Sequence, residues 1–99
     1  MMNDRMKEAV NAIHAGEKDR ARKLLVQVVE EDPNNGKAWI WLSKTIDDVE
    51  KKQKCLEQSI KVTPDSGEAH SNLCLLLYEK GEYQKGLEYA NKAISVLGK

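Results

Sequence analysis

The side chains best suited to catalysis or metal binding are few in this sequence and lie far apart. His14 and His70 are its two histidines, and Cys55 and Cys74 are its two cysteines. A zinc site or a proton-transfer site needs several such groups close together, for example a CxxC pair or a serine, a histidine and a carboxylate. Neither cysteine has a second cysteine or a histidine at ligand spacing, and no Gly-rich phosphate loop is present. We therefore predict no enzyme activity, no metal and no cofactor, two reduced and partly buried thiols, and a structural role for His70.

The most basic local feature is EKKQK, at residues 50–54, which follows Asp47 and Asp48. An acidic start followed by lysines suits the dipole of a helix, and no aromatic residues interleave with the lysines as they do in many nucleic-acid sites. The 16 basic and 16 acidic residues are mixed along the chain, so no region has the one-sided positive field that nucleic-acid binding needs. We predict a solvated helix face here and no nucleic-acid partner.

Length and hydropathy favour one small globular domain covering residues 1–99, because 40% of the 99 residues are hydrophobic. The longest apolar run extends from Leu73 to Tyr78 and is too short to cross a bilayer. The first residues lack the apolar run of a signal peptide. These features predict a soluble, cytoplasmic protein without a membrane partner.

Two loop-like stretches reveal an internal repeat. DPNNGKAW, residues 32–39, and TPDSGEAH, residues 63–70, have Pro, Gly and Ala in the same places. Between these breaks, apolar residues recur at spacings of three and four, which is typical of amphipathic helices. Gly16 and Gly81 stand where a left-handed turn would end a helix. The pattern predicts helices near residues 2–14, 18–31, 35–45, 48–62, 66–80 and 83–97.

The repeated positions have a characteristic composition. The first unit has Ala9, Ala12, Gly16, Ala21, Leu25 and Pro33; the second has Trp39, Leu42, Ser43, Ile46, Leu56 and Pro64; the third has His70, Leu73, Cys74, Leu77, Gly81, Gly86 and Ala90. In this pattern the chain resembles the tetratricopeptide repeat family, whose unit of about 34 residues reads W-x-x-L-G-x-x-Y, then A-x-x-x-F, then P. The resemblance implies an all-α, right-handed superhelical array of three antiparallel helical hairpins, with repeats near residues 2–35, 36–66 and 67–99.

The second unit departs from the family pattern. It is three residues short, since Ser43 to Cys74 spans 31 residues and Ala9 to Ser43 spans 34. IDDVEK, at residues 46–51, replaces the Gly-centred turn of the other two units. We expect the first helix of this unit to be nearly a turn shorter and the groove beside it to be shallower.

The resemblance also implies a partner-binding surface, because the first helices of such hairpins line a concave groove. Trp39 is then a core residue packed with Leu42 and Ile46, and Trp41 points toward the groove. By the same alignment the groove is lined by Met6, Val10, Ile40, Trp41, Lys44, Ser71, Asn72, Leu75 and Tyr78. A largely apolar and aromatic strip is typical of a protein-binding surface.

We predict that this groove binds a peptide or helix of another protein, with Trp41 as the anchor. Lys44, Asn72 and Tyr78 would orient the bound segment by hydrogen bonds. The alternative for Trp41 is that it packs sideways against a neighbouring hairpin and does nothing more.

One well-known role of the family does not fit this sequence. Its best-known peptide-binding members hold a C-terminal carboxylate of heat-shock chaperones with Lys, Asn and Arg side chains, and a carboxylate needs such charge-assisted donors. The matching positions here are Met6, Val10, Trp41, Glu68 and Asn72, none of which agrees. We predict that a chaperone C-terminal carboxylate peptide is not the partner.

The last predicted helix supports a second function. Leu87, Ala90, Ile94 and Leu97 form an apolar stripe along it, and no polar capping helix follows residue 97, although a terminal repeat usually needs one. The chain would then be a scaffold that forms homo-oligomers through residues 83–97. A domain that regulates an enzyme in trans is a third hypothesis.

Overall fold

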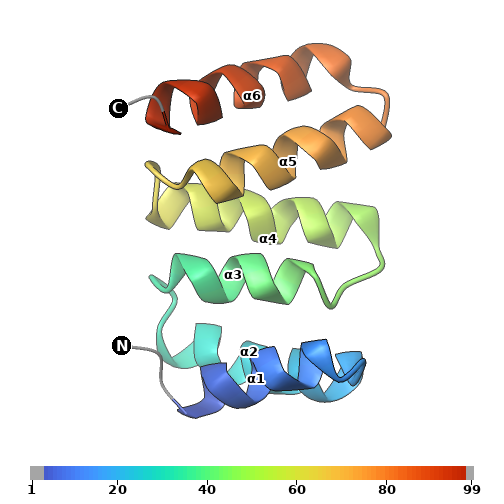
Figure 1. The fold of residues 1–99 in the computed structure, drawn as a ribbon, viewed down its shortest axis with the longest axis vertical. Coiled ribbons are helices and arrows are strands. Elements are labelled where there is room, and N and C mark those ends of the chain that lie inside the picture. Colours follow the sequence, from blue (N-terminus) through green and yellow to red (C-terminus); the bar gives the residue numbers. More distant parts are fainter. Residues whose placement is uncertain (1–3, 98–99) are drawn as a thin grey trace.

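The computed structural model describes residues 4–97 as six helices that stack in chain order (Figure 1). Consecutive helices pack on one another along the whole stack. The first, second and third hairpins are formed by α1 with α2, α3 with α4, and α5 with α6. The helices are α1 (Asp4–His14), α2 (Lys18–Glu31), α3 (Gly36–Ser43), α4 (Val49–Val62), α5 (Gly67–Glu79) and α6 (Tyr83–Leu97). The all-α array of three hairpins that the sequence predicts is confirmed.

Local hydrogen bonds explain where the helices begin. The side chains of Asn35, Asp48 and Ser66 each accept a hydrogen bond from the backbone N–H three residues later, at 3.1, 3.0 and 3.2 Å. These caps satisfy N–H groups that a helix start leaves without a partner. The predicted starts of α3, α4 and α5 fall on these capping residues; residues 2 and 3, where the first helix was predicted to begin, lie outside the described residues.

Two apolar clusters join the hairpins. The first connects the first hairpin to the second, and its buried members are Met6, Ala9, Leu25, Val28, Val29, Ala38, Leu42 and Cys55. The second connects α3 and α4 to α5 through Ile40, Leu56, Ala69, Leu73, Leu76 and Leu77. Trp39 and Ile46 pack against the first cluster as predicted. Fully buried alanines at 9, 21, 38 and 69 let the helices approach closely.

Trp39 and His70 make the same contact one repeat apart. The Nε1–H of Trp39 donates to the carbonyl oxygen of Pro33 at 2.8 Å, and Nε2 of His70 lies 2.9 Å from the carbonyl oxygen of Pro64. Each ring thereby ties the first helix of its hairpin to the loop before it. His70 is buried and its ring stacks on Tyr89 with centroids 5.9 Å apart. The predicted packing of this histidine in the structure is confirmed.

The second hairpin turns differently from the other two. Its first helix, α3, has 8 residues, whereas α1 has 11 and α5 has 13, so the predicted shortening is confirmed. Thr45 follows α3 and is fully buried. The guanidinium of Arg22, on α2, donates two hydrogen bonds to the carbonyl oxygen of Thr45, from Nε at 3.2 Å and from Nη2 at 3.0 Å. A neighbouring hairpin therefore holds this turn.

Candidate functional site

A recess lies between the second hairpin and α5. It has a volume of about 170 Å³ and is lined by Ser43, Lys44, Lys52, Leu56, Asn72, Leu75, Leu76 and Glu79. Leu56, Leu76 and Ser43 are buried and form its floor. Lys44, Leu75 and Glu79 are exposed at its rim, and Lys52 and Asn72 are half-buried. The recess thus combines an apolar floor with a mixed, charged rim.

Three of the predicted groove residues meet at this recess, namely Lys44, Asn72 and Leu75. Leu75 is 63% exposed, which is high for a large aliphatic side chain. It lies near Asn72 and Glu79 because these residues are three and four positions away on α5. The short α3 ends just before Lys44, which places this lysine across the recess from α5.

Trp41 lies at the edge of this surface and also packs sideways. Its half-buried ring packs against the first cluster and meets the His14 ring edge-on, with centroids 6.1 Å apart. The Lys44 ammonium lies 5.9 Å from the centroid of the same ring, within the range of a cation–π contact. The sideways packing that the sequence offered as the alternative is therefore present, and part of the ring is still accessible.

Met6 and Ile40 do not belong to an open surface. Each is only 3% exposed, Met6 in the first cluster and Ile40 in the second. The prediction that these two side chains line an accessible groove is corrected: they occupy the side of the first helix on which the next hairpin stacks. Ser71, the matching residue of the last hairpin, is half-buried.

The two remaining predicted groove residues lie away from the recess. Val10 is half-buried on α1. Tyr78 is 62% exposed near the end of α5, where its ring contacts that of Tyr83 edge-on with centroids 4.7 Å apart. The accessible residues of the predicted groove are therefore found in separate places: the recess, Trp41 at its edge, and Tyr78 beside Tyr83.

The charges around the recess are largely unpaired. Within residues 4–95, Lys44, Lys52 and Glu79 form no ion pair. Two cations and one anion thus face the solvent beside an apolar floor. This arrangement suits a ligand that places an aliphatic group on the floor and a carboxylate near the lysines.

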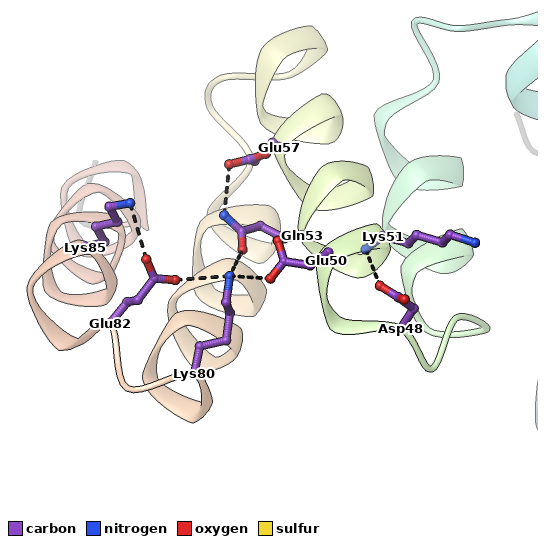
Figure 2. A network of polar contacts seen from close by, with 8 residues as sticks. All are labelled: Asp48, Glu50, Lys51, Gln53, Glu57, Lys80, Glu82 and Lys85. Atoms are coloured by element: carbon purple, nitrogen blue, oxygen red, sulfur yellow. Dashed lines mark hydrogen bonds and ion pairs between the residues drawn. The ribbon is translucent and has the colours of Figure 1, made fainter.

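A polar network beside the recess fixes α5 against α4 (Figure 2). The Lys80 ammonium contacts Glu50 at 3.0 Å, Glu82 at 3.1 Å and the side-chain oxygen of Gln53 at 2.6 Å. The hydrogen bond to Glu50, followed by the one to Glu82, raises the pKa of Lys80 above its usual value. The hydrogen bond from Lys80 likewise lowers the pKa of Glu82. The sequence indicated only a solvated face for residues 50–54, and no local pattern marks Lys80 as their partner.

Neither cysteine takes part in the recess. Cys55 is buried and Cys74 half-buried, and neither forms a disulfide within the described residues. Burial raises the pKa of the Cys55 thiol, which makes it less reactive at neutral pH. The described residues contain no group of three or more histidine, cysteine or acidic side chains placed to hold a metal ion. Between residues 4 and 97, no helix has the length and apolar character needed to span a bilayer.

Comparison with solved structures identifies the same fold in MamA. One crystal structure of MamA matches with a TM-score of 0.86 and 23% identity, over 93% of this chain and 56% of that one. The MamA RS-1 ArsTM double mutant gives 0.87 at 17% identity, over 93% and 53%. MamA 41-end from Desulfovibrio magneticus RS-1 gives 0.85 at 16%, over 93% and 54%. The chain spans about half the length of these structures.

No protein-family model matches the sequence, and no curated protein matches it significantly. The assignment therefore depends on the arrangement of the helices, which agrees closely although few residues are identical. The chain has the helical-repeat fold of MamA, a tetratricopeptide-repeat-like protein, as its repeat pattern predicted.

Proposed function

We propose that this chain is a non-catalytic protein-binding module that receives a short segment of a partner protein in the recess between α3, α4 and α5. The observation that carries the proposal is the exposed Leu75 at the rim of an apolar floor, beside Lys44 and Lys52, which form no ion pair within residues 4–95. The bound segment would place an aliphatic side chain against Leu56, Leu75 and Leu76. An Asp or Glu of the segment would face the two lysines.

Preorganisation supports this proposal. The floor residues belong to the second cluster, and the network around Lys80 fixes α5 beside α4. A partner segment would therefore bind with little reordering of this chain, so less binding energy is lost to entropy. Trp41 would extend the contact at the edge of the recess, and Asn72 would orient the segment by hydrogen bonds.

The test is selection of binders from a random peptide library against the wild-type chain. We expect enriched peptides to combine an aliphatic residue with Asp or Glu, and Leu75→Glu to abolish their binding. Val26→Glu is the matched control, because Val26 is also a partly exposed aliphatic residue but lies on α2, away from the recess. Lys44→Ala should weaken binding about two- to fivefold, the usual scale of an exposed ion pair.

Three results would count against the proposal. Equal peptide binding by the Leu75→Glu and Val26→Glu variants would place the site on another face. Enrichment of basic peptides would contradict the role of the lysines, and a library without binders would contradict peptide recognition itself. Trp41→Ala is a poorer first variant, since this ring also packs against the first cluster and its loss would weaken the fold.

Self-association is a second candidate function, favoured by one specific observation. Leu87 and Ile94 on α6 are 53% and 69% exposed. Exposed large aliphatic residues that share one helix face often mark a protein contact. This surface is separate from the recess, so both functions are compatible in one chain.

A further inference from the structure

The apolar stripe of α6 has the spacing of a helix-pairing seam. Tyr83, Leu87, Ala90 and Ile94 follow one another at intervals of four, three and four residues. Leu97 comes three residues later, although its side chain lies outside the described residues. Tyr83, Leu87 and Ile94 are exposed, and Ala90 is half-buried. Alternating intervals of three and four are the pattern by which two helices pair along their length.

The repeat shows which surface this stripe belongs to. Leu87 corresponds to Gln53 in the second hairpin and to Arg22 in the first, 34 and 65 residues earlier. In those hairpins this position contacts the next hairpin: Arg22 donates to the Thr45 carbonyl, and the side-chain oxygen of Gln53 accepts a hydrogen bond from the Lys80 ammonium. Leu87 is 53% exposed, so the stripe is a hairpin-stacking surface that the described residues leave largely open.

The opposite end of the stack does not complement this surface. The receiving positions of α3 are Ala38, Leu42 and Thr45, those of α5 are Ala69, Leu73 and Leu76, and all six are buried. The matching positions of α1 are Asp4, Glu8 and Asn11, and all three are exposed. Stacking α1 of another copy on α6 would bury two carboxylates against Leu87 and Ile94, which is unfavourable.

The charges on α6 favour pairing of this helix with itself. Lys85, Glu88 and Lys92 lie off the seam, and the residues that border the exposed side of the seam, Gln84 and Asn91, are uncharged. In an antiparallel pair, Tyr83 lies opposite the partner's Ile94 and Leu87 opposite the partner's Ala90. Each layer then joins a larger residue to a smaller one without like charges in contact.

We propose that two copies of this chain associate through α6 in an antiparallel, two-fold symmetric contact along Tyr83, Leu87, Ala90 and Ile94. The inference specifies the surface for the self-association proposed above and depends on it. A two-fold contact closes on itself, so it yields a dimer and not a filament. The recess is formed by other elements and stays open in this dimer.

Sedimentation velocity over a range of protein concentrations tests the pairing. We expect a concentration-dependent dimer for the wild type, and monomers at every concentration for Leu87→Glu and for Ile94→Glu. Leu75→Glu is the control, because it makes the same kind of change at an equally exposed residue on α5. Circular dichroism establishes that all variants keep their helices, which we expect because all three side chains are exposed.

Disulfide cross-linking tests the orientation, in a background where Cys55 and Cys74 are replaced by alanine and the helices are retained. A mixture of Tyr83→Cys and Ile94→Cys chains should cross-link under oxidation, and neither variant should cross-link with itself. Self-cross-linking of each variant would show a parallel pair. A cross-link between Glu8→Cys and Leu87→Cys chains would show head-to-tail stacking.

The outcomes distinguish self-association of the chain from the specific pairing through α6. A wild-type chain that is monomeric at all concentrations overturns both self-association and the α6 pairing. A dimer that survives Leu87→Glu and Ile94→Glu overturns only the pairing, and its loss in Leu75→Glu would assign the contact to the recess instead.

Discussion

The turns of the first and third hairpins each contain a glycine in a left-handed conformation, whereas the turn of the second has no glycine and receives two hydrogen bonds from the neighbouring hairpin. At Gly16 the backbone adopts φ 81°, and at Gly81 φ 82°, a left-handed conformation that glycine adopts without strain. Two backbone hydrogen bonds close each turn: Gly16 to Ile13 and Glu17 to Ala12, and Gly81 to Tyr78 and Glu82 to Leu77. All four are local in sequence.

The second turn lacks glycine and combines local backbone hydrogen bonds with contacts from distant residues. The Thr45 hydroxyl donates to the Leu42 carbonyl at 2.8 Å, but the Thr45 carbonyl is satisfied by Arg22, 23 residues earlier. Lys18 adds an ion pair to Asp47 at 3.0 Å. The first hairpin thus positions the end of α3, where Ser43 and Lys44 form one side of the recess. Substitutions in α2 that remove these contacts should therefore also disturb the proposed binding site.

The largest effect that distinguishes the turns is expected for Arg22→Met. This change keeps most of the aliphatic stem and removes both donors to the buried Thr45 carbonyl. An unsatisfied buried acceptor costs about 1–3 kcal/mol, so we expect urea denaturation to give a free energy of unfolding lower by about 2 kcal/mol.

The control for this prediction is Arg20→Met, since Arg20 lies on the same helix and forms exposed ion pairs with Glu17 and Glu8. It should change the free energy of unfolding by less than about 0.5 kcal/mol. Equal losses for the two arginine variants would show that the second turn does not depend on Arg22.

A smaller effect is expected at the glycine turns. Gly16→Ala and Gly81→Ala place a Cβ in open space, so the penalty comes from the left-handed backbone alone. We expect each to lower the free energy of unfolding by about 1–2 kcal/mol. Asn tolerates this conformation better than Ala, so Gly16→Asn and Gly81→Asn should lose less. Equal stability of the Ala and Asn variants in urea denaturation would contradict the backbone explanation.

The local turns were predictable from the sequence and the neighbour-held turn was not. Asn35, Asp48 and Ser66 marked helix starts, and Gly16 and Gly81 marked turns, because capping and left-handed turns depend on residues a few positions apart. The missing glycine in the second unit was also visible. The contact that holds this turn in place of a glycine could not be seen in the sequence, because Arg22 meets Thr45 only once two hairpins are stacked.

For the candidate site, the sequence predicted several of the residues but not how they are arranged. Lys44, Asn72 and Leu75 do meet, since the repeat places their helices side by side. Met6 and Ile40 were assigned to the wrong face, because one residue along a helix turns about 100° and separates the stacking side from the open side. The family alignment placed these residues on the first helices of their hairpins, but it did not show which side of each helix the next hairpin covers.

The smallest effect is expected for two sets of ion pairs as the pH falls: Lys18 with Asp47, and Lys80 with Glu50 and Glu82. The hydrogen bond from Lys18 lowers the pKa of Asp47, and the one from Lys80 lowers that of Glu82. A carboxyl group with a lowered pKa stabilises the fold above its unfolded pKa, about 3.9 for Asp and 4.3 for Glu. This stabilisation is lost as the pH falls through the lower, folded pKa. The pKa of Lys80 is raised in the folded state. The charged ammonium therefore contributes its full stabilisation below the unfolded pKa of lysine, about 10.4. This stabilisation is lost only as the pH rises through the folded pKa of Lys80.

Thermal unfolding at pH 7 and in the acid range below about pH 4 should therefore separate three variants. Lys18→Met and Lys80→Met should both melt slightly below wild type at neutral pH, and both differences should shrink in acid because the carboxylates become neutral. Lys80→Met should show the larger difference, since Lys80 contacts Glu50 as well as Glu82. Lys7→Met, which removes a lysine that forms no ion pair within residues 4–95, should show no pH-dependent difference. A difference for Lys80→Met that persists in acid would assign its effect to the hydrogen bond with Gln53, which does not titrate.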